Sequence, residues 1–210
     1  MTRAGRYLLV FLLAAVAGVA AYFAGRAWTG HAEAPAAAAS TAIAPAVVPD
    51  RRPEVTLADR DGKLRSLSEW NGKPQVINFW ATWCGPCRRE IPMLNALVAD
   101  PAFDGFAMIG IAIDFREDVL DFLKSTPVNY PVLIGEQDGL DAARAFGMES
   151  IGLPFTAFVD GSGRIVALHV GELHRPQADV ILSVVRSLDA GQIDLKAAQA
   201  RIRAEVPKVG

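Results

Sequence analysis

The chain has 210 residues, of which 51% are hydrophobic, and a formal net charge of −2 from 21 Lys and Arg against 23 Asp and Glu. This length provides one domain of ordinary size once the first fifty residues are set aside as a different kind of segment. Because basic and acidic residues are interspersed and form no basic stripe, the composition excludes a nucleic-acid-binding protein.

The N-terminal region contains an uncharged apolar segment over residues 7–24 (YLLVFLLAAVAGVAAYFA). Its length reaches the lower end of what crosses a hydrocarbon core. Arg3 and Arg6 precede it and only Arg26 follows closely, which predicts that the rest of the chain is exported. A cleaved signal peptide and an uncleaved signal-anchor both fit, and the unbroken apolar run through Tyr22 and Phe23 favours the anchor.

Four regions are therefore expected. Residues 1–28 form a signal-anchor or transmembrane segment, and residues 29–51 form an Ala/Pro-rich linker without apolar periodicity. Residues 52–190 form the folded domain, and residues 191–210 form an amphipathic tail that packs either on the domain or on a partner. The expected location is the inner (cytoplasmic) membrane, as a single-pass protein whose domain faces the periplasm or the outer surface.

Strand and helix patterns alternate along the folded domain. An N-terminal hairpin with a turn at residues 59–62 comes first, followed by a short helical turn. Five further strands are expected at residues 75–80, 106–113, 130–134, 155–159 and 165–170. Four helices are expected between or after them, at residues 86–98, 117–124, 140–146 and 180–188. This order predicts an α/β three-layer sandwich with a mixed central sheet.

Both cysteines of the chain, Cys84 and Cys87, lie where the buried strand 75–80 gives way to a helix. A disulfide across so short a loop removes little chain entropy, so a structural staple explains them poorly. A zinc site needs three or four ligands, and only His31, His169 and His174 could add to the two thiols. Reversible redox chemistry remains, because a helix N-terminus stabilises a thiolate.

The two thiols are expected to have different roles. Cys84 precedes the helix and is the candidate nucleophile, whereas Cys87 lies one turn inside and is the candidate resolving thiol. Pro86 suits the first turn of a helix. Arg88 and Arg89 either add positive potential near the thiolate or are solvated surface residues, and the second interpretation is favoured.

The sequence WCGPC after the strand NFWAT, with Pro92 in the following helix, resembles the thioredoxin superfamily. It is most similar to the membrane-anchored TlpA/ResA-type thiol-disulfide oxidoreductases. The likeness runs from about Val55 to Leu188 and includes an extra βα insertion at residues 106–126 and the stretch GLPFT at residues 152–156.

The resemblance implies specific roles around the cysteines. Cys84 and Cys87 would form the redox-active disulfide, and Pro154 would be a cis-proline facing them. Leu153 would offer backbone groups to an extended substrate segment, and Trp83 would help to position that substrate. A proline that opens a strand cannot donate to the ladder, which independently favours a special position.

Asn78 departs from cytosolic thioredoxins, which resemble this strand but carry a buried Asp that is thought to accept the proton of the resolving thiol. An amide cannot titrate, so another base or water must deprotonate Cys87. Glu90 and Asp114 are the nearby carboxylates, and both are more often surface or strand-end charges. The sequence therefore leaves the base unassigned.

Three functions compete. The leading one is an extracytoplasmic enzyme that reduces selected protein disulfides, for which the family implies cytochrome c maturation or metal-site assembly, and Gly85-Pro86 resembles the dipeptide of reducing thioredoxins. The alternatives are a disulfide-forming oxidant and a non-catalytic binding or chaperone module. No cofactor or metal is expected; the expected partners are exported protein disulfides and a transmembrane thiol electron donor, because the outer compartment is oxidising.

Overall fold

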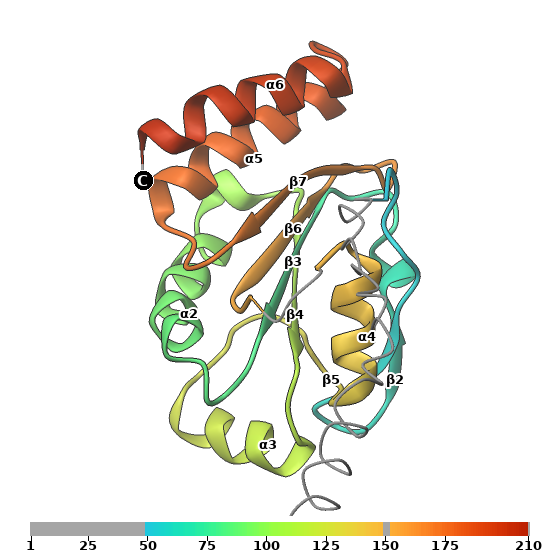
Figure 1. Cartoon of the computed structure of the whole chain (residues 1–210), viewed down its shortest axis with the longest axis vertical. Helices are drawn as coiled ribbons and strands as arrows, with labels where there is room; N and C mark the ends of the chain where they lie inside the picture. The colour runs from blue at the N-terminus through green and yellow to red at the C-terminus, as the bar shows by residue number, and fades with distance from the viewer. Residues whose placement is uncertain (1–48, 149–151, 210) are drawn as a thin grey trace, which may run out of the picture. The chain divides into compact units, whose positions relative to one another are not determined.

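The computed structural model of the chain describes residues 49–148 and 152–209. In this part of the chain, seven strands form one sheet in the order β2-β1-β5-β4-β3-β6-β7 (Figure 1). β3, β4 and β5 are mutually parallel, and the other neighbouring pairs are antiparallel, so the predicted mixed sheet is confirmed. The strands are β1 (Thr56–Asp59), β2 (Leu64–Ser66), β3 (Gln75–Trp80), β4 (Ala107–Ala112), β5 (Val132–Ile134), β6 (Phe155–Val159) and β7 (Ile165–Val170).

Helices cover both faces of this sheet, which gives the expected three layers (Figure 1). α2, α3, α5 and α6 contribute to the core on one face, and α4 contributes to the core on the other. The helices are α2 (Gly85–Val98), α3 (Arg116–Ser125), α4 (Gln137–Ala145), α5 (Arg175–Asp189) and α6 (Leu195–Glu205), with short 3-10 turns η1 (Leu67–Trp70), η2 (Pro101–Phe103) and η3 (Val206–Lys208).

The central strand β3 is buried over its whole length because both of its faces carry a core. Val76 and Trp80 point into the core shared with α2 and α5, and Ile77 and Phe79 point into the core shared with α4. Full burial of such side chains stabilises the fold by roughly 1.5–3 kcal/mol each relative to exposure. The strand therefore fixes the position of whatever follows Trp80, which is the cysteine loop.

Two helices begin earlier than their apolar periodicity predicts. α5 starts at Arg175 rather than at residue 180, because His174 and Gln177 form a reciprocal capping box and Pro176 fits the first turn. α4 starts at Gln137, three residues before the predicted start. A Cβ atom on its early residue Gly139 would lie 3.5 Å from the carbonyl oxygen of Ala112 at the end of β4, which is ordinary van der Waals contact.

The C-terminal residues form α6, which packs on α5 and β7. Ala198 and Ile202 of α6 are buried in the same core as α5. The predicted apolar segment at residues 7–24 and most of the linker lie outside the described residues. Within residues 49–148 and 152–209, no helix has the length and apolar character needed to cross a membrane.

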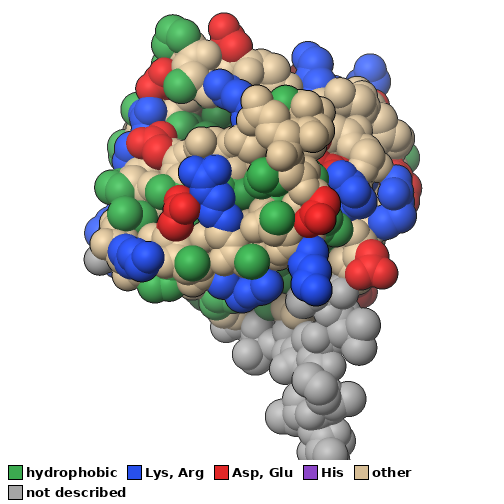
Figure 2. All heavy atoms as spheres, turned by 90° about the horizontal axis from the view of Figure 1, so that it is seen from above, with side chains coloured by type: hydrophobic (Ala, Val, Ile, Leu, Met, Phe, Trp, Pro, Cys, Tyr) green, Lys and Arg blue, Asp and Glu red, His purple; other side chains and the backbone are tan. Residues whose placement is uncertain are grey.

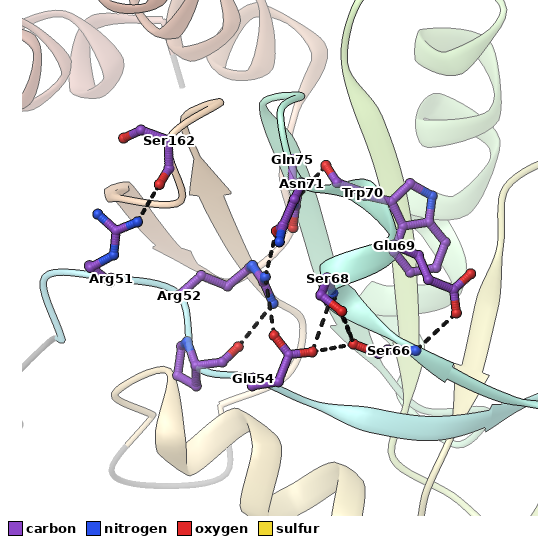
Figure 3. Close-up of polar contacts among 11 residues, drawn as sticks. Arg51, Arg52, Glu54, Ser66, Ser68, Glu69, Trp70, Asn71, Gln75 and Ser162 are labelled. Atoms are coloured by element: carbon purple, nitrogen blue, oxygen red, sulfur yellow. Dashed lines mark hydrogen bonds and ion pairs between the residues drawn. The ribbon is translucent and has the colours of Figure 1, made fainter.

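The first described residues are attached at the turn between β6 and β7. The backbone N–H of Arg52 donates to Gly163 O at 2.9 Å, and the N–H of Ile165 donates to Asp50 O at 3.0 Å. The Arg52 guanidinium also donates to Asn71 and Glu54, and Glu54 accepts from Ser66 and Ser68 (Figure 3). This polar cluster fixes the start of the domain at the end of the sheet where β6 stops.

The molecular face seen from above in Figure 2 carries Lys, Arg, Asp and Glu side chains interspersed with apolar ones. No single sign of charge dominates that face. This distribution agrees with the small net charge of the whole chain.

Candidate active site

The cysteine pair lies where the sequence predicts, at the junction between β3 and α2. Cys84 is the N-cap of α2, and the Cys84–Cys87 disulfide joins it to the first turn of the helix. The backbone N–H of Cys87 points at the Cys84 sulfur, with N and Sγ 3.3 Å apart. A thiolate at Cys84 would therefore meet a backbone donor and the positive end of the helix dipole, both of which stabilise its charge.

The two sulfur-bearing residues differ in access to solvent. Cys87 is fully buried in the core beneath α2, whereas Cys84 retains a small exposed surface. Pro86 occupies the first turn, where its missing N–H costs no hydrogen bond. Both residues are thus buried, and Cys84 is the less completely buried of the two.

The Leu153–Pro154 peptide bond is cis, as the resemblance to thioredoxins implied. Pro154 is buried directly before β6, and its carbonyl accepts the N–H of Gly171 at 2.8 Å. Because β6 starts opposite Phe79 near the end of β3, this dipeptide lies at the same edge of the sheet as the cysteine loop. Among the described residues, no backbone hydrogen bond engages Leu153.

Three large apolar side chains at this edge are exposed to solvent: Trp83 at 64%, Phe115 at 51% and Val170 at 65%. They follow or end β3, β4 and β7 respectively. Of these three residues, only Trp83 is expected from the sequence to position a substrate. Phe115 and Val170 could have been found as apolar residues at strand ends, but their closeness to the cysteines depends on sheet order.

Asp114 holds two of these strand ends together. Its Oδ2 accepts from the backbone N–H and the hydroxyl of Thr82, at 3.0 and 2.5 Å, and its Oδ1 accepts from the N–H of Phe115 at 2.9 Å. The loop after β4 is therefore fastened to the residue just before Trp83. Asp114 is a positioning residue in this geometry.

Glu90 is a carboxyl group to which the sequence assigns no role. It lies one helical turn after Cys87 and points into the core, with 1% of its surface exposed. Residues three apart on a helix are neighbours, with Cβ atoms about 5–6 Å apart. The available signal was its position on the apolar face of α2, between Cys87 and Leu94, where a charge is out of place.

The Glu90 carboxyl has neutral hydrogen-bond partners only. Asn78 Nδ2 donates to Oε1 at 2.7 Å, and the backbone N–H of Leu173 donates to Oε2 at 2.9 Å. Burial raises the pKa of Glu90 to about 7, against the lowering effect of these two donors, and the charge of Glu172 adds to the rise. A carboxyl with this pKa can both accept and release a proton near neutrality.

The two arginines after Cys87 are engaged elsewhere. Arg89 pairs with Glu172, with Nη2 and Oε2 2.6 Å apart. The Arg88 guanidinium lies over the Phe122 ring, 6.0 Å from its centroid. The favoured interpretation of both as surface residues agrees with these contacts. Within the described part of the chain, no group of three or more His, Cys, Asp or Glu is placed to bind a metal ion.

This fold and this cysteine site define a thioredoxin-like protein, and comparison with known families agrees. The model of the family described as Redoxin matches residues 47–182, which is more than half of the chain. The chain therefore belongs to the Redoxin family.

Curated proteins similar to this chain are named thiol-disulfide oxidoreductases. The thiol-disulfide oxidoreductase ResA of Bacillus cereus is 30% identical over 135 residues, which cover 63% of this chain and 75% of the relative. A protein of the same name from Geobacillus thermodenitrificans is 29% identical over 122 residues, covering 58% and 68%.

Solved structures give the same result. A thiol:disulfide interchange protein of the thioredoxin family from Chlorobium tepidum is 30% identical with a TM-score of 0.57, covering 65% of this chain and 96% of that one. The thioredoxin domain of a thiol-disulfide oxidoreductase from Bacteroides vulgatus is 25% identical with a TM-score of 0.54, covering 65% and 94%. The present chain is a thioredoxin-like thiol-disulfide oxidoreductase, and its resemblance to the ResA-type thiol-disulfide oxidoreductases is confirmed.

Proposed function

We propose that the protein is an extracytoplasmic reductase of selected protein disulfides, held at the inner membrane by its N-terminal segment. The observation that carries this proposal is the oxidised Cys84–Cys87 pair at a helix N-terminus, beside cis-Pro154 and above a buried carboxyl without a cationic partner. The apolar segment at residues 7–24 and the arginines before it support the location.

In the proposed reaction, the reduced protein attacks a substrate disulfide through Cys84. The Cys84 thiolate bonds to one substrate sulfur, and the other leaves as a thiolate that takes up a proton. Glu90 then accepts the proton of the Cys87 thiol, and the resulting thiolate attacks Cys84 in the mixed disulfide. The Cys84–Cys87 disulfide forms, and the second substrate sulfur leaves as a thiolate that takes up a proton from solvent, so two electrons pass to the substrate.

Substrate positioning falls to the exposed edge around Cys84. Trp83, Leu153 and Pro154 contribute the apolar wall and the strand end, and Phe115 and Val170 extend it. An extended substrate segment can add to the sheet edge at Leu153 by backbone hydrogen bonds. Such a site would bind a substrate through backbone hydrogen bonds and apolar contacts, which suits a protein disulfide better than a small molecule.

The direction of electron flow is proposed from Gly85-Pro86, the dipeptide that resembles reducing thioredoxins. Equilibration with glutathione should leave the pair oxidised until the buffer is strongly reducing, near the roughly −270 mV of thioredoxin. A potential near about −120 mV would instead identify a disulfide-forming oxidant. A reductase in an oxidising compartment needs electrons from the cytoplasm, so we propose a transmembrane thiol carrier as donor and cytochrome c maturation or metal-site assembly as the destination.

The roles of the cysteines are tested by trapping. Cys87→Ser in the full chain removes the resolving step, so disulfide adducts of Cys84 with exported proteins and with the donor should accumulate on a non-reducing gel. Cys84→Ser is the matched control and should trap almost nothing, because Cys87 is buried. Equal adducts from both variants would refute the assignment of nucleophile and resolving thiol, and the identity of the adducts would name the pathway.

A further inference from the structure

The βα insertion at residues 106–126 supplies β4 and α3, and it reaches the active-site edge at Phe115. β4 pairs with β3 in parallel, with Ala112 opposite Trp80 at the end of both strands. β6, which Pro154 precedes, pairs with the other side of β3. Because neighbouring strands lie about 4.8 Å apart, the loop after β4 lies beside the cysteine loop, on the side opposite to Pro154.

Phe115 is the first residue of an apolar stripe on α3 that continues through Val119 and Phe122. Side chains spaced by four and three residues share one face of a helix. Val119 is fully buried, and the centroid of the Phe122 ring lies 5.5 Å from that of the Trp80 ring. This face of α3 therefore packs on β3, and Phe115 lies at its active-site end with 51% of its surface exposed.

Phe115 is also the N-cap of α3, a position that its side chain does not suit. An N-cap Ser, Thr, Asp or Asn accepts a hydrogen bond from the first turn of the helix, and Phe115 makes no such bond. Its side chain is half exposed, so burial recovers only part of its apolar area. Helix capping and core packing thus do not account for this residue. A residue that breaks such local rules is typical of a functional site.

Asp114 fixes Phe115 to the loop that carries the cysteines. Asp114 is 7% exposed, and its carboxyl accepts two hydrogen bonds from Thr82 and one from the backbone N–H of Phe115. Trp83 follows Thr82 directly and is 64% exposed. One buried carboxyl therefore holds the backbone at both exposed aromatic residues before a substrate arrives. Such preorganisation lowers the entropic cost of binding.

The strand order places a substrate contact on each side of Cys84. Leu153 and Pro154 lie on the β6 side, and Phe115 lies on the β4 side. An extended substrate segment rises about 3.3 Å per residue, and neighbouring strand ends are about 4.8 Å apart. The substrate residue that reaches Phe115 is therefore roughly one to three positions from the cysteine that bonds to Cys84. An exposed phenyl ring favours an apolar side chain at that position.

We propose that Phe115 is a specificity-determining residue, which favours protein disulfides that carry a large apolar side chain roughly one to three residues from the reacting cysteine. The role of Phe115 rests on the disulfide reduction proposed above and leaves its steps unchanged. Phe115 touches the substrate and takes no part in proton or electron transfer. The insertion thereby gives the enzyme a preference among substrates that the cysteine pair alone does not provide.

Two synthetic peptides test this preference. Each carries one cysteine in a mixed disulfide with glutathione, and they differ only in having Phe or Ser two positions to either side of it. The reduced full-length protein should reduce the Phe peptide with a kcat/KM about tenfold higher. Phe115→Ser should bring this ratio down to about twofold, whereas Phe115→Leu should keep most of it. Leu64→Ser is the matched control and should keep the full ratio, because Leu64 is 69% exposed but lies on β2 at the far edge of the sheet.

A general effect of a substitution on the cysteine pair divides out of this ratio. Phe115→Ser should unfold at the same or a higher temperature, because Ser can accept the capping hydrogen bond that Phe cannot. An unchanged ratio in Phe115→Ser, or equal rates with both peptides for the wild type, would overturn the role of Phe115. So would a lower unfolding temperature combined with an equal loss on both peptides, which is the result for a structural residue. A wild type that reduces neither peptide would instead refute the proposed reductase function.

Discussion

Two buried carboxyl groups lie at opposite ends of this sheet and behave in opposite ways. Glu90, beside the cysteines, is 1% exposed, and Asp160, at the turn between β6 and β7, is 0% exposed. Burial acts to raise the pKa of both. It prevails at Glu90, where the pKa is about 7, but not at Asp160, where the pKa is lowered.

The difference comes from the partners. Asp160 accepts from the backbone N–H of Arg164 at 2.8 Å, from the hydroxyl of Ser162 at 2.8 Å and from the Arg164 guanidinium at 2.6 Å. Glu90 accepts from one amide and one backbone N–H, and no cation reaches it. A buried carboxyl that is fully paired stabilises a turn, whereas one that is incompletely compensated is available for proton transfer.

The largest effect is expected on catalysis. Glu90→Gln should lower the rate of the resolving step about 100- to 1,000-fold at pH 7, because loss of a general base removes this much. Rapid-mixing measurement of mixed-disulfide decay gives the rate. Asp160→Asn is the matched control and should leave the rate of the resolving step unchanged. An equal loss of rate in both variants would contradict a catalytic role that belongs to Glu90 and not to Asp160.

The next effect is on stability and has an unexpected sign. In the folded state Glu90 binds its proton up to about pH 7, whereas the unfolded state releases it near its ordinary value of 4.5. Stability should therefore fall as pH rises between these two values and stay lower above, by about 3 kcal/mol in total. Glu90→Gln removes this titration. In denaturant unfolding, the variant should have a higher free energy of unfolding than the wild type at pH 8, but not at pH 4. A wild type without this decline would contradict the raised pKa.

Asp160 should behave in the reverse manner. Its folded-state pKa is lowered, so its contribution is present above the unfolded-state pKa and disappears as pH falls through the folded-state pKa. Asp160→Asn should destabilise the protein by about 2 kcal/mol at pH 7, because charge-assisted hydrogen bonds are lost. The two proteins should converge in acid, and a constant difference across pH would show that packing rather than charge is responsible.

The smallest effect is expected at the partner of Asp160. Arg164 is partly exposed, and its guanidinium makes one of the three hydrogen-bond contacts to the carboxyl. Arg164→Gln should cost only about 0.5 kcal/mol at pH 7, because solvent screens the pair and two neutral donors remain. Thermal unfolding at low and high salt would measure this loss of stability. A loss as large as that of Asp160→Asn would mean that the Arg164 charge alone accounts for the stabilising effect of Asp160.

The sequence predicted the features of the site that depend on local order. The buried strand before Trp80, the helix that begins beside Cys84, the mixed sheet and the cis peptide bond at Pro154 all follow from short stretches or from their likeness to a family. These features are encoded by neighbours in the chain or by a motif, so a single sequence reveals them.

The environment of Glu90 could not be predicted in the same way. One of its hydrogen bonds comes from the backbone N–H of Leu173, 83 residues away in the chain. The other comes from Asn78, which the sequence shows only as an amide at a position where cytosolic thioredoxins carry an acid. Phe115 and Val170 likewise reach the active-site edge through sheet order. Burial and hydrogen-bond partners depend on tertiary structure, so from the sequence alone Glu90 resembles a surface charge on a helix.

The most direct test of this account is the titration of Glu90 in the oxidised full-length protein, followed by carbon NMR of the labelled side-chain carboxyl. Glu90→Gln assigns the signal, and Asp160→Asn identifies the contrasting carboxyl at the other end of the sheet. The midpoint for Glu90 should lie close to pH 7, and the midpoint for Asp160 should lie below the usual range. A midpoint for Glu90 near its ordinary value of 4.5 would contradict the raised pKa.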